Sequence, residues 1–171
     1  MDHEFVRQVR ARRSIRSYTD QKIPRDMLIA LAEAGLSAPS ARNGRPWELV
    51  IIENEETLRK LSTMRPYWKM LDGAAAAIIV AGQDGRYFQQ DCAACTQNIL
   101  LSVQAMGLGG VWLGLYPNMD VVEEVAKLVE LPTEILPLCV ISLGYPAGEI
   151  PQPRPADHSK IHFERFNKEK E

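Results

Sequence analysis

The stretch from Cys92 to Met119 contains no charged residue, although charged residues make up 25% of the chain. Its first part continues a helix that the pattern predicts over residues 87–106. The apolar side chains are spread around much of that helix: they are Ala93, Ala94, Ile99, Leu100, Val103 and Met106. A helix that is apolar nearly all round is buried. Thr96, Gln97 and other polar residues interrupt it, and no unbroken run of roughly 20 apolar residues exists, so the pattern does not predict a membrane span.

The length of the chain limits how such a helix can be buried. A chain of 171 residues suffices for one domain with a proper core, but such a domain has little room to enclose a helix on every side. We therefore expect the helix over 87–106 to lie at a subunit interface and the protein to be a homodimer. We expect one domain over residues 1–171, in which residues 147–171 form an extended tail on the partner subunit.

Periodicity, caps and turn residues predict the remaining elements. Further helices are expected over 4–13, from Pro24 to before Pro39, from the Asn54 cap to about 64, and over 121–129. Strands are expected over 47–52, 74–81, 111–116 and 135–143, with an irregular aromatic segment over 65–73.

Composition excludes several classes of protein. A net charge of −2 argues against a nucleic-acid binder, because such proteins usually carry a broad basic face. Three cysteines are an odd number and do not suggest a disulfide framework, so a reducing cytoplasm is the expected location. The polar and basic residues 1–16 do not resemble a signal peptide.

Arg12, Arg13, Ser14 and Arg16 form a local cluster of anion-binding side chains. Guanidinium groups bind phosphate through paired hydrogen bonds, and a hydroxyl can donate beside them. Because the chain as a whole is slightly acidic, the cluster favours a small bound molecule with an anionic group. From spacing alone, a solvated basic helix end that complements the helix dipole explains the cluster equally well.

Two further segments have the composition of a ligand edge. The loop over 39–47 is dense in turn formers and hydrogen-bonding side chains, although a plain helix-to-strand connection is the simpler explanation. In the segment Gly109–Gly114, glycines flank a short apolar strand and permit close approach of a flat ligand. The alternative there is a tight turn packed against the core.

The cysteines and histidines give little support to other chemistry. Cys92 and Cys95 form a C-x-x-C, but they fall inside the apolar helix and two further zinc ligands of suitable spacing are absent, so we expect no metal and a structural role. His3, His158 and His162 have no paired acid at catalytic spacing. No G-x-S-x-G nucleophile motif is present, which argues against a hydrolase.

Short motifs follow one another in a specific order along nearly the whole chain. They are RRSIRSY at 12–18, PSA at 39–41 with Asn43 and Pro46-Trp47, DCAA at 91–94 through Gln97-Asn98, GLG at 107–109 with WLG at 112–114, LGYP at 143–146 and KIHFE at 160–164. Each motif is weak alone. The ordered set resembles the nitroreductase family of FMN-dependent oxidoreductases.

The resemblance implies an α+β fold: a nitroreductase-like three-layer α/β/α sandwich with a central mixed, mainly antiparallel sheet, in an intertwined homodimer with FMN at the subunit interface. The residues expected at the FMN phosphate and ribityl chain are Arg12, Arg13, Ser14 and Arg16, with Arg154 as the nearest basic candidate from the tail. Those expected to meet the flavin from the other subunit are Pro39, Ser40, Ala41 and Asn43. Those expected near the isoalloxazine ring are Val111, Trp112, Leu113 and Gly114.

The resemblance also implies an activity. NADH or NADPH would pass hydride to flavin N5, and a nitroaromatic, quinone or similar small-molecule acceptor would then use the same face in a ping-pong mechanism. No side chain is named as catalytic, because the cofactor carries the chemistry. Another flavin chemistry, such as dehalogenation, and a non-catalytic flavin-binding or sensing protein remain alternatives.

Three departures from the family pattern affect these expectations. Arg45 stands where many relatives have Gln, which alters contacts beside the flavin. Ala156 precedes Asp157 where a second basic residue is common, which leaves the share of the tail in phosphate binding open. The chain is also short for the family, so we expect an open pocket shaped by residues 65–70.

Overall fold

A computed structural model describes residues 3–166 of the chain. Its centre is a sheet of four strands, which are β1 (Trp47–Ile52), β2 (Ala76–Gln83), β3 (Gly109–Gly114) and β4 (Ile135–Gly144). The strands lie in the order β1-β2-β4-β3, and each neighbouring pair is antiparallel. The only parallel pairing among residues 3–166 is an isolated bridge from Ser14 to Gly110. The predicted mainly antiparallel sheet is therefore confirmed, and its mixed character rests on this bridge.

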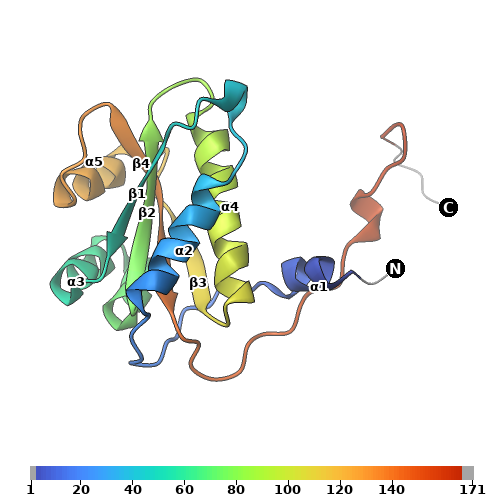
Figure 1. Cartoon of the computed structure of the whole chain (residues 1–171), viewed down its shortest axis with the longest axis horizontal. Coiled ribbons are helices and arrows are strands. Elements are labelled where there is room, and N and C mark those ends of the chain that lie inside the picture. Colours follow the sequence, from blue (N-terminus) through green and yellow to red (C-terminus); the bar gives the residue numbers. More distant parts are fainter. Residues whose placement is uncertain (1–2, 167–171) are drawn as a thin grey trace.

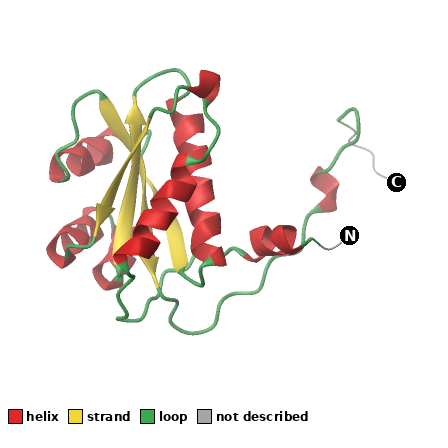
Figure 2. Ribbon diagram, viewed as in Figure 1, coloured by secondary structure: helices red, strands yellow, loops and turns green. Residues whose placement is uncertain are grey.

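Helices cover both faces of the sheet, which confirms the predicted three layers (Figures 1 and 2). One face carries α2 (Arg25–Leu36) and α4 (Phe88–Ala105), and the other carries α3 (Glu55–Met64), α5 (Met119–Leu128) and the 3-10 segment η2 (Pro66–Gly73). Asn54 caps α3 as predicted, because its side chain accepts a hydrogen bond from the Thr57 N–H. Segment 65–70 thus lies across the sheet from α4.

The core follows from the apolar character of the two central strands. In β2, residues 76–82 are all buried, and β4 is buried from residue 137 to its end. Strands buried on both faces read as continuous apolar runs, as these do. In contrast, the apolar sequence of β1 predicts a buried strand, but β1 is an edge strand in which only Trp47 and Ile52 are buried. Strand β3 begins at Gly109, two residues before the predicted start at 111, and Gly107 with φ +71° makes the turn from the helix.

One side of α4 is buried by the chain and the other is not. Its buried residues, from Phe88 to Val103, face the sheet and α2. The opposite side is half-buried or exposed and carries no charge: it includes Gln90, Ala94, Gln97, Leu101 and Gln104. A single copy of the chain therefore leaves open an uncharged face of its longest described helix. No helix among residues 3–166 is both long and apolar enough to cross a membrane.

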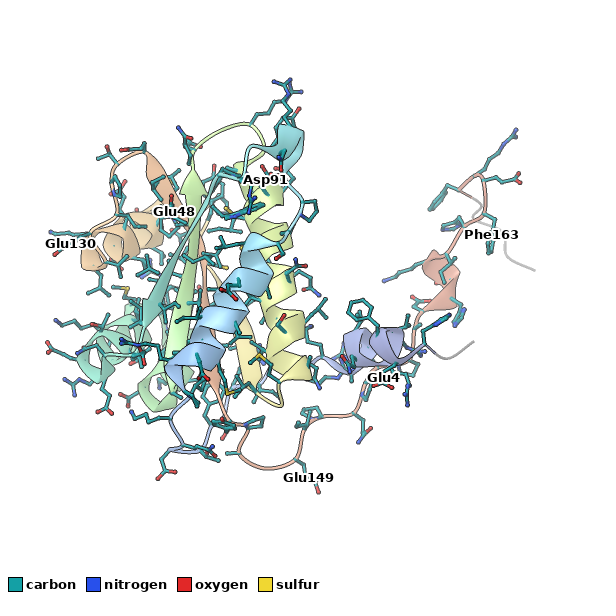
Figure 3. All side chains as sticks on the ribbon, viewed as in Figure 1. Glu4, Glu48, Asp91, Glu130, Glu149 and Phe163 are labelled. Carbon is teal, nitrogen blue, oxygen red and sulfur yellow. The ribbon has the colours of Figure 1, made fainter. Side chains whose placement is uncertain are left out.

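Two segments extend away from the sheet and helices (Figure 1). Helix α1 (Glu4–Ala11) has no buried residue, and its apolar Phe5 is 67% exposed. The tail runs outward from Ala147 past the short 3-10 turn η3 (His158–Lys160), and its Phe163, labelled in Figure 3, is 85% exposed. The predicted tail continues to residue 171, and its last part, 167–171, lies outside the described residues.

All three cysteines are buried and free, as expected for a structural role. Burial raises the pKa of Cys92, Cys95 and Cys139 from 9.0 to about 12. Thiols that stay protonated at neutral pH are poor nucleophiles and poor metal ligands. No group of three or more candidate metal ligands exists among residues 3–166.

The buried thiols predict a loss of stability in alkaline solution. Below pH 9 the thiols are protonated in both states, whereas between pH 9 and 12 those of the unfolded chain ionise and those of the folded chain do not. The free energy of unfolding should therefore fall across this window, with Cys139 alone contributing up to about 1.4 kcal/mol per pH unit. Urea titrations at pH 7 to 11 measure this slope, and Cys139→Ala should make it shallower. An equal slope in both proteins would contradict this prediction.

Candidate functional site

The arginine cluster is attached to the open edge of β3. The Ile15 N–H donates to the Gly110 carbonyl over 3.0 Å, and the Ile15 side chain is buried. A side chain at Gly109 would collide with Ile15, since its Cβ would lie 2.8 Å from the Ile15 Cβ. Glycine at 109 therefore lets residues 12–16 lie directly on the sheet. Because successive side chains of an extended segment alternate, Ser14 and Arg16 point away from the core that receives Ile15.

Tyr18 fixes the other end of this segment. Its hydroxyl contacts the Ile15 carbonyl at 2.8 Å and the Ser142 carbonyl at 3.2 Å, and burial raises the Tyr18 pKa to about 12. The ring packs against Gly144, where an added Cβ would lie 2.6 Å from the ring. The absence of a side chain at 144 thus makes room for the anchor of the arginine segment.

Gly144→Ala is expected to displace Tyr18 and destabilise the protein. Overpacking of a filled site typically costs about 1–3 kcal/mol, and the displacement should also disturb residues 12–16. Urea denaturation measures the effect. Gly85→Ala is the matched control, because an added Cβ there meets nothing within 4 Å; equal stability of the two variants would show that Tyr18 is not held by this contact.

A cavity of about 600 Å³ lies between the arginine segment and the tail. Its lining contains four arginines, which are Arg10, Arg12, Arg13 and Arg154, together with Ser14, Pro151, Gln152 and Ala156. No Asp or Glu of the described chain is among the residues that line it. The structure therefore places Arg154 of the tail in the same cavity as three of the four predicted cluster residues. Arg16 does not line it; its guanidinium lies 3.5 Å from the Ser14 carbonyl.

Arg13 binds the end of α1 and also carries a donor without a partner. Its guanidinium donates to the Arg10 carbonyl over 2.9 Å and to the Arg12 carbonyl, which satisfies groups at the end of α1. This is the helix-end role that the sequence also allowed. Its Nε is buried and has no hydrogen-bond partner among the described residues. A buried donor without a partner is costly, so this atom is suited to an acceptor supplied by a ligand.

The edge of β3 beyond Gly110 presents free backbone groups. The Gly110 carbonyl points outward to Ile15, and groups of alternate residues point the same way. The backbone N–H and C=O of Trp112 and Gly114 therefore face the open edge, where no strand of the described chain pairs with them. Val111 and Leu113 have buried side chains, at 1% and 4% exposure, and Trp112 is 36% exposed. Of these four predicted residues, only Trp112 has a side chain available to a ligand.

The second predicted segment, from Pro39 to Asn43, lies at the other end of α4. Its Ala41 N–H donates to Oδ1 of Asp91 in the first turn of α4 over 2.9 Å. The arginine segment instead meets Gly110, beyond the last turn of that helix. A helix of 18 residues is about 27 Å long. One copy of the chain therefore does not bring the two predicted halves of the site together.

Several residues of the site were not predicted from the sequence. Arg10 and Gln152 line the cavity, Tyr18 anchors the arginine segment, and Asp91 binds the loop. Asp91 had a detectable signal, because it is the last charged residue before the uncharged stretch that begins at Cys92. Arg10 and Gln152 had none, since only the path of the tail brings them together.

Comparisons with known proteins agree with this architecture. Residues 9–65 and 62–145 match the Nitroreductase family. A Methanothermobacter thermautotrophicus protein, provisionally named NADH dehydrogenase/NAD(P)H nitroreductase, is 37% identical over 169 residues, which are 95% of this chain and 88% of the relative.

Two solved structures extend the comparison. A crystal structure from Bacteroides thetaiotaomicron with the same provisional name has a TM-score of 0.93 at 40% identity, covering 97% of this chain and 100% of that one. An FMN-dependent nitroreductase of Clostridium difficile has a TM-score of 0.88 at 26% identity, covering 94% of this chain and 99% of that one. The chain belongs to the nitroreductase family.

Proposed function

We propose that this chain is an FMN-dependent NAD(P)H oxidoreductase that works as a homodimer, with each FMN held between two copies. Family membership supports the enzyme class and the cofactor. The observation that carries the proposal is the cavity between residues 12–16 and the tail. Four arginines line it, and no Asp or Glu of the described chain does.

The residues of this cavity fit the phosphate of FMN. Arg12 and Arg154 would supply charge-assisted hydrogen bonds to its oxygens, and the exposed Ser14 hydroxyl would donate beside them. The unpartnered Arg13 Nε offers a further buried donor. Among residues 3–166, no carboxylate forms an ion pair with Arg12, Arg13 or Arg154. A dianion would therefore meet donors that are not already neutralised.

The edge of β3 fits the polar rim of a flavin. When bound, FMN would take hydride from NADH or NADPH at N5 and pass it to an acceptor. The outward backbone groups of Trp112 and Gly114 would hydrogen-bond the ring and fix its orientation. No catalytic acid or base is assigned to a side chain of this site.

The second half of the site would come from the partner. The uncharged open face of α4 and the exposed apolar residues of α1 and the tail support a large subunit interface. In a two-fold dimer, the loop at one end of α4 can reach the arginine segment at the opposite end of the other copy. Residues 39–43 of the partner would then meet the flavin.

The acceptor that we propose is a small flat oxidant such as a nitroaromatic or a quinone. In one chain, segment 65–70 lies in the layer of α3, across the sheet from α4, and does not line the arginine cavity. A ring held at the edge of β3 would therefore have no wall from that segment of its own chain, and it would stay accessible. Nicotinamide and acceptor would use one pocket in turn, which predicts ping-pong kinetics.

A spectroscopic and kinetic experiment tests this function. Purified protein reconstituted with FMN should show flavin absorption bands, and NADH or NADPH should bleach them under anaerobic conditions. Menadione or nitrofurazone should restore them, with parallel lines in double-reciprocal plots. Bound FMN without turnover would favour a flavin-binding or sensing role, and failure to bind FMN would overturn the proposal.

A further inference from the structure

The geometry points to Asp91 as a positioning residue that holds the loop over 37–46 in the conformation needed to contact FMN in the partner's site. This inference rests on the proposed function, and it concerns a residue to which the family resemblance gave no role in binding. Asp91 lies beneath the loop, in the first turn of α4, whereas the loop itself runs from the end of α2 to β1 (Figure 3).

The backbone of the loop adopts an energetically unfavourable conformation at three residues. Arg42, Asn43 and Arg45 adopt φ values of +55°, +56° and +46°. Such left-handed conformations disfavour residues other than glycine, and asparagine tolerates them better than arginine does. Two unfavourable arginine positions within four residues indicate that contacts hold this shape, and such strain concentrates at ligand sites.

Most hydrogen bonds of the loop are internal or go to the preceding helix. The Ser40 hydroxyl accepts from the Arg45 N–H over 2.9 Å, and the Arg45 guanidinium donates to the Leu36 carbonyl over 3.2 Å. These bonds fix the shape of the loop and its path from the end of α2, and at the far end of the loop the Pro46 carbonyl accepts from the Gln83 N–H over 3.0 Å. Between residues 37 and 45, the Asp91 bond to Ala41 is the only side-chain bond in the described structure that reaches another part of the fold.

Asp91 is suited to this task because it is itself fixed. It is only 7% exposed and sits in the first turn of α4, where the helix dipole favours a carboxylate. The same helix carries the open face that we assign to the dimer interface. Asp91 thus couples the position of residues 39–43 to the interface across which they would reach the partner's flavin.

Substitutions at 91 separate positioning from charge and from general stability. Asp91→Asn keeps the Oδ1 acceptor and should retain FMN affinity and turnover within about threefold. Asp91→Ala removes the acceptor and should weaken FMN binding by about tenfold or more. It should also change the visible circular dichroism of the bound flavin, which reports ring orientation. Ala41→Pro removes the donor instead and should reproduce the Asp91→Ala spectrum if the protein folds, because Ser40 is already extended.

The control variant is Asp120→Ala, which also removes an acid from the first turn of a helix, α5, on the other face of the sheet. It should leave both the affinity and the spectrum unchanged. If the wild type binds FMN and Asp91→Ala binds it equally with the same spectrum, the inference fails and the proposed function stands. If Asp91→Asn is as defective as Asp91→Ala, the charge matters and the positioning role is wrong. A wild type that binds no FMN overturns the proposed function itself.

Discussion

Arg12→Glu should weaken FMN binding by about a thousandfold, which is close to 4 kcal/mol. The loss has two parts of similar size. Removal of the guanidinium deletes charge-assisted hydrogen bonds worth about 1.5–3 kcal/mol, and the new carboxylate would face the phosphate in a cavity that now contains only basic charge. Equilibrium titration of apoprotein with FMN, followed by quenching of flavin fluorescence, measures the affinity.

The matched control for this charge reversal is Arg59→Glu. Arg59 lies exposed on α3, in the layer across the sheet from α4. Its replacement should change FMN affinity by less than about twofold at moderate ionic strength, since distant exposed charges are screened. If Arg12→Glu bound FMN as tightly as the control, the arginine cavity would not be the phosphate site.

Leu101→Glu should dissociate the dimer and, as a consequence, release FMN. Leu101 lies half-buried on the open uncharged face of α4. A carboxylate enclosed there without a partner costs several kcal/mol, so the dimer dissociation constant should rise by about a hundredfold or more. Sedimentation velocity at micromolar concentration should show monomers, and FMN should be lost on gel filtration.

Met119→Glu provides the comparison for this variant. Met119 is 42% exposed at the start of α5, so Met119→Glu likewise introduces a carboxylate at an apolar surface position. It should remain dimeric and yellow. A monomeric Leu101→Glu protein that retained FMN would contradict the two-copy site, whereas a dimeric Leu101→Glu protein would show that this face of α4 is not the interface.

The sequence predicted the elements well because their local signals were strong. The apolar run at 74–81 and the Asn54 cap each have a local physical cause; the run forms the central strand β2, which begins two residues later than predicted, and the cap is confirmed. The position of β1 at the sheet edge was missed, because an apolar strand looks alike at the edge and in the centre. The start of β3 was misplaced by two residues, since Gly109 and Gly110 resemble a helix stop and are needed instead for close approach of Ile15 and β4.

The site was predictable in composition but not in arrangement. Arg12, Arg13 and Ser14 were found from their side chains, and the cavity that they share with Arg154 depends on the tail passing beside them. The role of Asp91 depends on a contact across 50 residues of sequence, which no local pattern contains. That residues 39–43 lie far from the arginine segment in one copy also follows only from the fold.

The central claim, that each site is built from two copies, is tested most directly with a heterodimer. One chain carries Arg12→Glu, and the other has residues 41–43 replaced by glycines; the two are co-expressed with different tags and purified through both. Each homodimer should bind no FMN. The heterodimer pairs the intact arginine segment of one chain with the intact loop of the other at one of its two sites, so it should bind about half the FMN of the wild type. A heterodimer as empty as the two homodimers would contradict the account.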